Sequence, residues 1–159
     1  MNRYLLLLET LYAVAKKTRV DGLKSLVKHL DDPARSLFFS AAMAQEPAAT
    51  AFMCDSLQMV AAGMSLDEVT FYMDGYRLRL ISADKADSHL VNLVFRTVWA
   101  IAHSGWDPIA CTEFGRAAVP AAQSMGRKEW IAYCNSLEIE RTQTNINWDA
   151  LLKEIKPGA

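Results

Sequence analysis

The sequence predicts an all-α fold, a compact domain of about seven short-to-medium helices without a transmembrane segment. Apolar residues recur at helical spacing, and residues that start or stop helices divide the chain into separate stretches. No stretch shows the alternation of apolar and polar residues that marks a half-buried strand. At 159 residues the chain can bury a core and suits a single domain over residues 1–159.

The longest helical stretch, residues 3–30, carries apolar residues on one face at about 3.6 residues per turn. These residues are Leu5, Leu8, Leu11, Tyr12, Ala15, Leu23, Leu26 and Leu30. The opposite side is mostly basic, with Lys16, Lys17, Asp21, Lys24 and Lys28. Arg19 departs from this pattern, because on a straight helix it would lie within the apolar face. Either Gly22 breaks the helix and turns Arg19 outward, or this face belongs to a contact in which Arg19 meets a carboxylate.

Start and stop residues predict the remaining helices, the last of them short: 33–44, 49–62, 65–82, 89–103, 108–119, 127–137 and 148–155. Asp32 and Asp107 each precede a proline, which is a typical helix start. Ser65 and Glu68 have the spacing of a capping box. Gly115 costs about 1 kcal/mol relative to alanine inside a helix, so we expect another backbone to approach it closely.

The helical period within these stretches also predicts which side chains face the core. They are Leu37, Phe38, Met43, Phe52, Met53, Leu57, Val60, Val69, Tyr72, Met73, Tyr76, Leu80, Leu90, Leu93, Val94, Val98, Ile101, Trp130 and Tyr133. The polar residues 82–88 are expected to form a short connector between two helices.

Composition limits the classes of function. The net charge of −1 gives no support for nucleic-acid binding. Residues 1–30 hold six Lys/Arg against two Asp/Glu, so the remainder is net acidic, and this basic first helix favours an acidic protein partner. The apolar residues that follow Arg3 are interrupted at Glu9, too early for a signal peptide. The apolar stretch at residues 90–102 is too short for a membrane helix. We expect a cytoplasmic protein that reaches the inner membrane only through a partner.

Residues with catalytic or metal-binding chemistry are scattered. His29, His89 and His103 lack a ligand partner at helical spacing, and the three cysteines suggest neither a disulfide framework nor a zinc site. His103, Asp107 and Cys111 could together suggest a hydrolase, although Cys111 is better explained as a buried thiol on a helix. We therefore expect no enzyme activity, no cofactor and no metal.

Two blocks of the chain resemble the cytoplasmic parts of MotA, the stator subunit of the proton-driven flagellar motor. The first block spans residues 4–82 and includes AKKTRVDGLKSL, in which the matching residues are Ala15, Lys16, Arg19, Gly22 and Leu26, followed by Asp32 and Pro33. The second block spans residues 89–138 and includes GWDPIACTEFGR, with matching residues Gly105, Pro108, Ile109, Ala110, Glu113, Phe114, Gly115 and Arg116. Residues 83–88 connect the blocks, and residues 139–159 form a polar tail with a short helix.

The chain also departs from that family. The first two membrane helices of the family would precede Tyr4, and the third and fourth would lie where the connector stands. In the family, an arginine and a glutamate eight residues later contact charged residues of the rotor protein FliG. The arginine corresponds to Arg19, but Val27 stands at the position of the glutamate.

Two functions follow from this resemblance and from the charge pattern. The first is a non-enzymatic stator-like domain that binds a rotor-like or secretion-apparatus protein through Arg19, Lys16, Lys24 and Lys28. The second is an accessory or structural subunit of a secretion or conjugation apparatus that reuses the fold, with a homo-oligomer left open. Val27 and the missing membrane helices favour the second function.

Overall fold

The computed structural model describes residues 3–103, 105–120, 123 and 125–143. Within these residues it contains eight α-helices, two short 3-10 helices and no strand, so the predicted all-α class is confirmed. Among the same residues, no helix combines the length and the apolar character needed to cross a bilayer. The chain divides into two compact units, residues 1–124 and residues 125–159, and each is described by itself.

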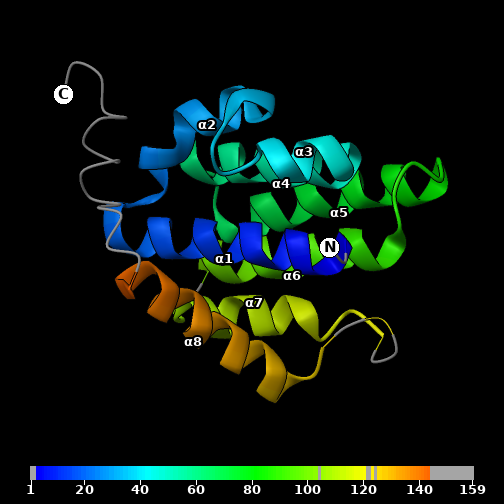
Figure 1. The fold of residues 1–159 in the computed structure, drawn as a ribbon. Coiled ribbons are helices and arrows are strands. Elements are labelled where there is room, and N and C mark those ends of the chain that lie inside the picture. The colour runs from blue at the N-terminus through cyan, green and yellow to red at the C-terminus, as the bar shows by residue number, and fades with distance from the viewer. Residues whose placement is uncertain (1–2, 104, 121–122, 124, 144–159) are drawn as a thin grey trace. The chain divides into compact units, whose positions relative to one another are not determined.

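Helix α1 (Arg3–Asp21) packs against α3 (Ser40–Gln45), α6 (Ser88–His103) and α7 (Pro108–Arg116). In Figure 1, α3 and α7 lie on opposite sides of α1. Burial therefore covers more of the helix than the predicted face. The buried residues are Tyr4, Leu6, Leu7, Leu8, Thr10, Leu11, Tyr12, Val14 and Ala15. The predicted apolar face was too narrow, because a single face assumes that other helices pack on one side of α1 only.

Helix α1 ends at Asp21, and the prediction of one helix through residue 30 was wrong. Gly22 adopts φ 81° and ψ 155°, a backbone conformation that essentially only glycine tolerates. A 3-10 helix, η1 (Leu23–Leu26), and the short helix α2 (Val27–Asp31) follow it. The first of the two explanations for Arg19, a helix break at Gly22, is the one that the structure shows.

The predicted helix over residues 33–44 is also interrupted. It consists of a single 3-10 turn, η2 (Pro33–Arg35), and the later helix α3. Between them Ser36 is extended, and its hydroxyl oxygen accepts a hydrogen bond from the Phe38 backbone N–H at 3.0 Å. A serine that bonds its own neighbourhood in this way competes with helix formation. Asp32 precedes η2 but makes no side-chain capping bond, so its predicted capping role was wrong.

The interruption changes which side chains in this segment reach the core. Leu37 was expected inside, but 70% of its surface is exposed. Phe39 and Ala42 are buried instead, while Phe38 and Met43 are half-buried. The helical period assumed for residues 33–44 has the wrong phase because the extended Ser36 shifts it.

Helices α4 (Pro47–Ala61) and α5 (Leu66–Ser82) agree closely with the prediction. Pro47 occupies the first turn of α4. Ser65 and Glu68 form the expected capping box: the Ser65 hydroxyl accepts the Glu68 N–H, and the Glu68 carboxylate accepts the Ser65 N–H, both at 3.2 Å. These signals act within one turn of chain, which is why they can be recognised without the tertiary structure.

Helix α6 lies at the centre of the first unit and contacts α1, α4, α5 and α7. Its buried residues include four of the five predicted core positions, Leu90, Leu93, Val94 and Val98. Helix α7 begins as expected, with the Asp107 carboxylate accepting the Ala110 N–H at 2.9 Å. It ends at Arg116, three residues earlier than predicted.

The second unit contains helix α8 (Arg127–Gln143), which is longer than the predicted 127–137. The rings of Trp130 and Tyr133 stack with centroids 5.9 Å apart. The short helix expected over residues 148–155 lies outside the described residues.

Candidate functional site

Arg19 lies at the C-terminal end of α1, exposed to solvent. Its Nη1 donates a hydrogen bond to the carbonyl oxygen of Gly105 at 3.2 Å. Gly105 belongs to the loop between α6 and α7, so this bond joins two segments 86 residues apart in the sequence. The bond joins the first sequence block, residues 4–82, to the second, residues 89–138.

The other predicted partner-binding cations differ in their exposure. Lys24 in η1 and Lys28 in α2 are exposed. Lys16 is half-buried, with its ammonium 5.8 Å from the centroid of the Tyr12 ring. Among the described residues, Arg19 has no carboxylate within ion-pair distance, unlike its neighbour Lys17, which pairs with Asp21. Arg19, Lys24 and Lys28 therefore present positive charge to solvent from three consecutive elements.

Two apolar side chains next to the Arg19–Gly105 bond are also exposed. Val20 follows Arg19 and has 76% of its surface exposed, and Trp106 follows Gly105 with 46% exposed. We call Arg19, Val20, Gly105 and Trp106 the Arg19 surface. Sequence reasoning missed Val20 and Trp106, because only the fold brings their two segments together.

An aromatic cluster supports the indole of Trp106. Its ring contacts Trp99 at 6.3 Å and Phe114 at 5.8 Å between centroids, both edge-on. Trp99 and Phe114 also contact each other at 5.7 Å. The Arg96 guanidinium lies 4.9 Å from the Phe114 ring centroid and donates to the Phe114 carbonyl at 3.3 Å. Trp106 is thus an exposed indole fixed from behind, which is the kind of residue that often dominates a protein–protein interface.

The three residues considered for a hydrolase take structural positions. Asp107 caps α7, and the exposed His103 packs on Trp99 with centroids 4.7 Å apart. Cys111 is buried, as expected of a thiol on a helix, and its Sγ lies 3.7 Å from the Trp106 carbonyl oxygen. Within the described residues, no group of three or more His, Cys, Asp and Glu side chains has the arrangement of a metal site. This geometry gives hydrolase chemistry no support.

The three thiols of the chain are buried. None of Cys54, Cys111 and Cys134 forms a disulfide. Burial, together with the nearby Asp55 charge, raises the pKa of the Cys54 thiol to about 12. Since the thiolate is the nucleophilic form, Cys54 is inert at neutral pH.

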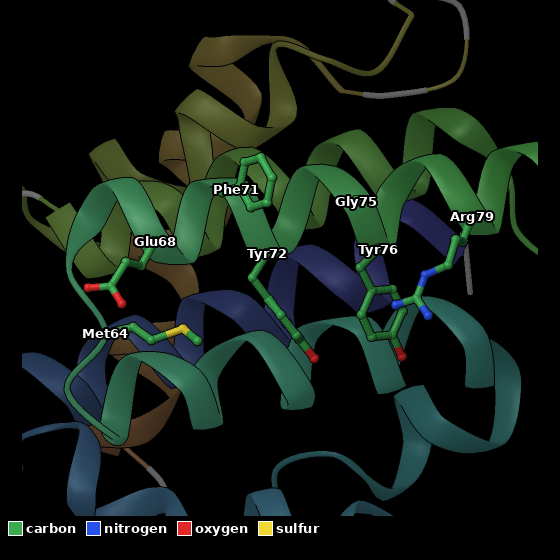
Figure 2. Close-up of a pocket in the computed structure, with 7 residues that line it drawn as sticks. All are labelled: Met64, Glu68, Phe71, Tyr72, Gly75, Tyr76 and Arg79. Carbon is green, nitrogen blue, oxygen red and sulfur yellow. The ribbon is translucent and has the colours of Figure 1, made fainter.

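A second feature of the first unit is a shallow surface groove along α5, shown in Figure 2. Its lining comes from the turn between α4 and α5 and from one side of α5: Met64, Glu68, Phe71, Tyr72, Gly75, Tyr76 and Arg79. Glu68 lies near one end and Arg79 near the other, and the Phe71 ring points away from the two tyrosines. Phe71 has 84% of its surface exposed, whereas both tyrosines are half-buried.

Two tyrosines form the floor of this groove and are held in place by neighbouring groups. The Tyr76 hydroxyl donates to the Asp55 carboxylate at 2.8 Å, and burial together with this bond raises the pKa of Tyr76. Burial and the Asp55 charge also raise the pKa of Tyr72. The Arg79 guanidinium lies 5.2 Å from the Tyr76 ring centroid. The groove therefore has a rigid floor, one acidic end and one basic end.

Comparison of the chain with protein-family models, with curated proteins and with solved structures gives no match.

Proposed function

We propose that this chain is a non-enzymatic, MotA-like protein-interaction domain that binds an acidic protein of a flagellar motor or a related envelope machine. It would act in the cytoplasm and reach the inner membrane only through that partner. The binding residues are Arg19, Lys24 and Lys28, with Lys16 contributing from the edge. The observation that supports this proposal best is the exposed Arg19 guanidinium, which is anchored to the Gly105 carbonyl beside an exposed tryptophan.

The chemistry of the Arg19 surface fits protein recognition. Arginine and tryptophan are the residue types most often found to dominate binding energy at interfaces. The Gly105 carbonyl uses one guanidinium nitrogen of Arg19, and the guanidinium has further N–H groups that can donate to a partner carboxylate. Lys24 and Lys28 add positive charge that accelerates association and selects acidic partners. Val20 and Trp106 supply the apolar contact that an exposed ion pair alone lacks.

Binding to a panel of candidate partners, rotor proteins and secretion-apparatus proteins, tests this function. We expect one of them to bind the full chain, with affinity that falls between low and high salt because exposed charges are screened. Arg19→Glu should abolish that binding, and Trp106→Ala should weaken it at both salt concentrations. Binding that does not respond to salt, or that persists in Arg19→Glu, would refute the electrostatic interface.

Matched controls separate the interface from general effects of charge. Lys128→Glu in α8 makes the same change of charge at another exposed position and should leave binding unchanged. Because Arg19 also bonds Gly105, the thermal unfolding of Arg19→Glu should be measured beside its binding. A variant that unfolds like the parent chain but no longer binds identifies Arg19 as a contact residue.

A second function, an accessory or structural subunit of a secretion or conjugation apparatus, is favoured by the position of Val27. Val27 begins α2 and is half-buried, and the break at Gly22 places it on a different helix from Arg19. In the MotA family the arginine and the glutamate belong to one helix. A rotor-type electrostatic pair is therefore altered in both chemistry and geometry. Binding to secretion-apparatus proteins and not to rotor proteins in the same panel would select this second function.

A further inference from the structure

The outward face of α5 carries apolar side chains that nothing covers within the described residues. Phe71 is 84% exposed, Leu78 is 54% exposed and Ile81 is 37% exposed. Phe71 and Leu78 are seven residues apart, which places them on the same side of the helix two turns from each other. Exposed aromatic and aliphatic side chains that line up on one helix mark a candidate interaction surface.

Gly75 lies between these two side chains, and because it has no side chain of its own, the helix surface is depressed at this point. A Cβ atom added at Gly75 would have no heavy atom within 4 Å, so the position is open to solvent. Glycine inside an exposed helix is unfavourable by roughly 1 kcal/mol relative to alanine, and helix stability does not explain its presence here. A small residue at such a point allows the backbone of a second helix to approach closely.

The charges on α5 are arranged with opposite signs at its two ends. Asp67 and Glu68 are exposed in the first turn, and Arg79 is exposed in the last. Glu68 and Arg79 both border the groove beside the apolar residues. This arrangement complements itself when a second copy of the helix runs in the opposite direction, because each acidic end then meets a basic end.

We propose that α5 is the contact surface of a twofold-symmetric homodimer, in which the α5 helices of two copies pack antiparallel across Gly75. Phe71 and Leu78 lie symmetrically about the helix midpoint at residues 74–75, so each phenyl ring meets the leucine of the other copy. Glu68 and Arg79 are almost symmetric about the same point, so each carboxylate faces the guanidinium of the other copy. Such an interface is isologous, with the same surface used on both copies.

The proposed dimer is a concentration-dependent one. A single pair of helices lies at the low end of the size range of specific interfaces, so dissociation within the accessible concentration range is expected. This association is independent of the Arg19 surface, and Arg19→Glu should leave it unchanged. The partner-binding proposal and the dimer proposal can therefore fail separately, and the two failures can be distinguished.

Sedimentation velocity of the full chain over a wide concentration range provides the first test. We expect the mass to rise from that of one 17.7 kDa chain toward that of two. Phe71→Glu should keep the chain monomeric at every concentration. Leu37→Glu places the same charge at another strongly exposed apolar residue, 70% exposed, and should leave the dimer intact. A monomer at all concentrations, or a dimer that Phe71→Glu does not disturb, overturns the proposal.

A charge-exchange experiment tests the antiparallel geometry. In a dimer, Glu68→Arg places an arginine opposite Arg79 of the other copy, and Arg79→Glu places a glutamate opposite Glu68 of the other copy. Each variant alone should therefore dimerise more weakly than the parent chain. Mixed together, the two variants restore both opposite-charge pairs in one heterodimer and should associate more tightly than either does alone. Thermal unfolding of Glu68→Arg accounts for the loss of its capping-box bond. Mixing that gives no gain over the separate variants rules out this pairing.

A cysteine placed on the expected symmetry axis gives an independent measurement. Under mild oxidation, Gly75→Cys should form a disulfide-linked dimer. Ala83→Cys, at an exposed position beyond the end of α5, should not. Equal cross-linking of the two variants would contradict an axis at Gly75.

Discussion

Gly115 of α7 lies directly against Thr97 of α6. A Cβ atom on Gly115 would overlap the Thr97 hydroxyl and would lie 2.8 Å from the Leu93 carbonyl oxygen. The Thr97 hydroxyl itself donates to that same carbonyl at 2.8 Å, so these groups are held in place within the buried side of α6. The close approach of another backbone that the mid-helix glycine predicted is confirmed, and it fixes how α6 and α7 pack.

Gly115→Ala should therefore destabilise the chain by about 1–3 kcal/mol, the usual cost of overpacking a core. The gain in helix propensity, about 1 kcal/mol, acts in the opposite direction and is too small to prevail. Urea unfolding followed by circular dichroism measures the change in free energy of unfolding. Thr97→Ala in the same chain should relieve only part of the cost, because the Leu93 carbonyl remains in the way.

Gly75→Ala provides the matched control for Gly115→Ala. The same substitution is made inside a helix, but no atom lies within 4 Å of the added Cβ. At protein concentrations low enough for the chain to be monomeric, it should stabilise by roughly 0.5–1 kcal/mol. If both variants shifted the unfolding free energy in the same direction, packing at Gly115 would not be the cause.

Gly22→Ala should destabilise the chain by roughly 1–3 kcal/mol, although there is open space around the position. The cost is conformational, because φ 81° with ψ 155° is strained for any residue that has a Cβ. Asparagine tolerates the left-handed helical region, but ψ 155° lies outside that region, so Gly22→Asn should be no better than Gly22→Ala. Thermal unfolding of the two variants checks this, and full recovery by asparagine would contradict it.

Ser65→Ala should cost about 1 kcal/mol of stability, because it removes the side-chain oxygen that accepts the Glu68 N–H at the start of α5. Asp32→Ala is the matched control. Asp32 also precedes a helical turn, but it makes no capping bond there, so its loss should change the unfolding free energy by less than about 0.5 kcal/mol. Equal losses in the two variants in urea unfolding would show that the capping bond does not carry the effect.

His29 should make the protein less stable in mild acid. Burial, with a contribution from the Lys17 charge, lowers the pKa of His29 below its ordinary value of about 6.5. The unfolded chain therefore binds more protons than the folded chain as the pH falls through that value, and the free energy of unfolding decreases. Unfolding measured between neutral pH and pH 5 should show a shallower slope for His29→Gln. A slope for His29→Gln equal to that of the parent chain would contradict this prediction.

Glu9 should have the opposite pH dependence. Burial raises the pKa of its carboxyl group, so the folded chain binds this proton more tightly than the unfolded chain. The associated stability is fully present below the ordinary pKa of about 4.3 and is lost as the pH rises through the raised value. Glu9→Gln should consequently raise the unfolding free energy more at pH 7 than at pH 4. An equal change in unfolding free energy at the two pH values would contradict this prediction.

Helix starts were the part of the fold that the sequence predicted best. The capping box at Ser65 and the cap at Asp107 each act through side-chain hydrogen bonds within one turn of chain. Asp32 also precedes a proline, as Asp107 does, but its side chain makes no capping bond. The helix expected after Asp32 is interrupted where the Ser36 hydroxyl accepts the Phe38 N–H. A local start signal thus decides where a helix begins only when no other local hydrogen bond competes for the backbone groups of that segment.

The candidate site was predictable in part. The charge imbalance of residues 1–30 identified Arg19, Lys24 and Lys28, which are exposed, but it also included Lys16, which is half-buried. Trp106 was missed, since its importance depends on the contact between Arg19 and Gly105, 86 residues apart. The α5 stripe of Phe71 and Leu78 was missed because apolar residues at helical spacing are ordinarily assigned to the core.

By itself, the sequence determined the helical class of this protein, most of its helix starts and its basic first thirty residues, because these depend on residue type and on neighbours within a turn or two. The tertiary structure alone decided that α1 is buried on more than one side, that Arg19 is anchored to Gly105, and that α5 keeps an apolar face in solvent. Those features depend on which helices pack against which, and such contacts join residues whose separation along the chain gives no local signal.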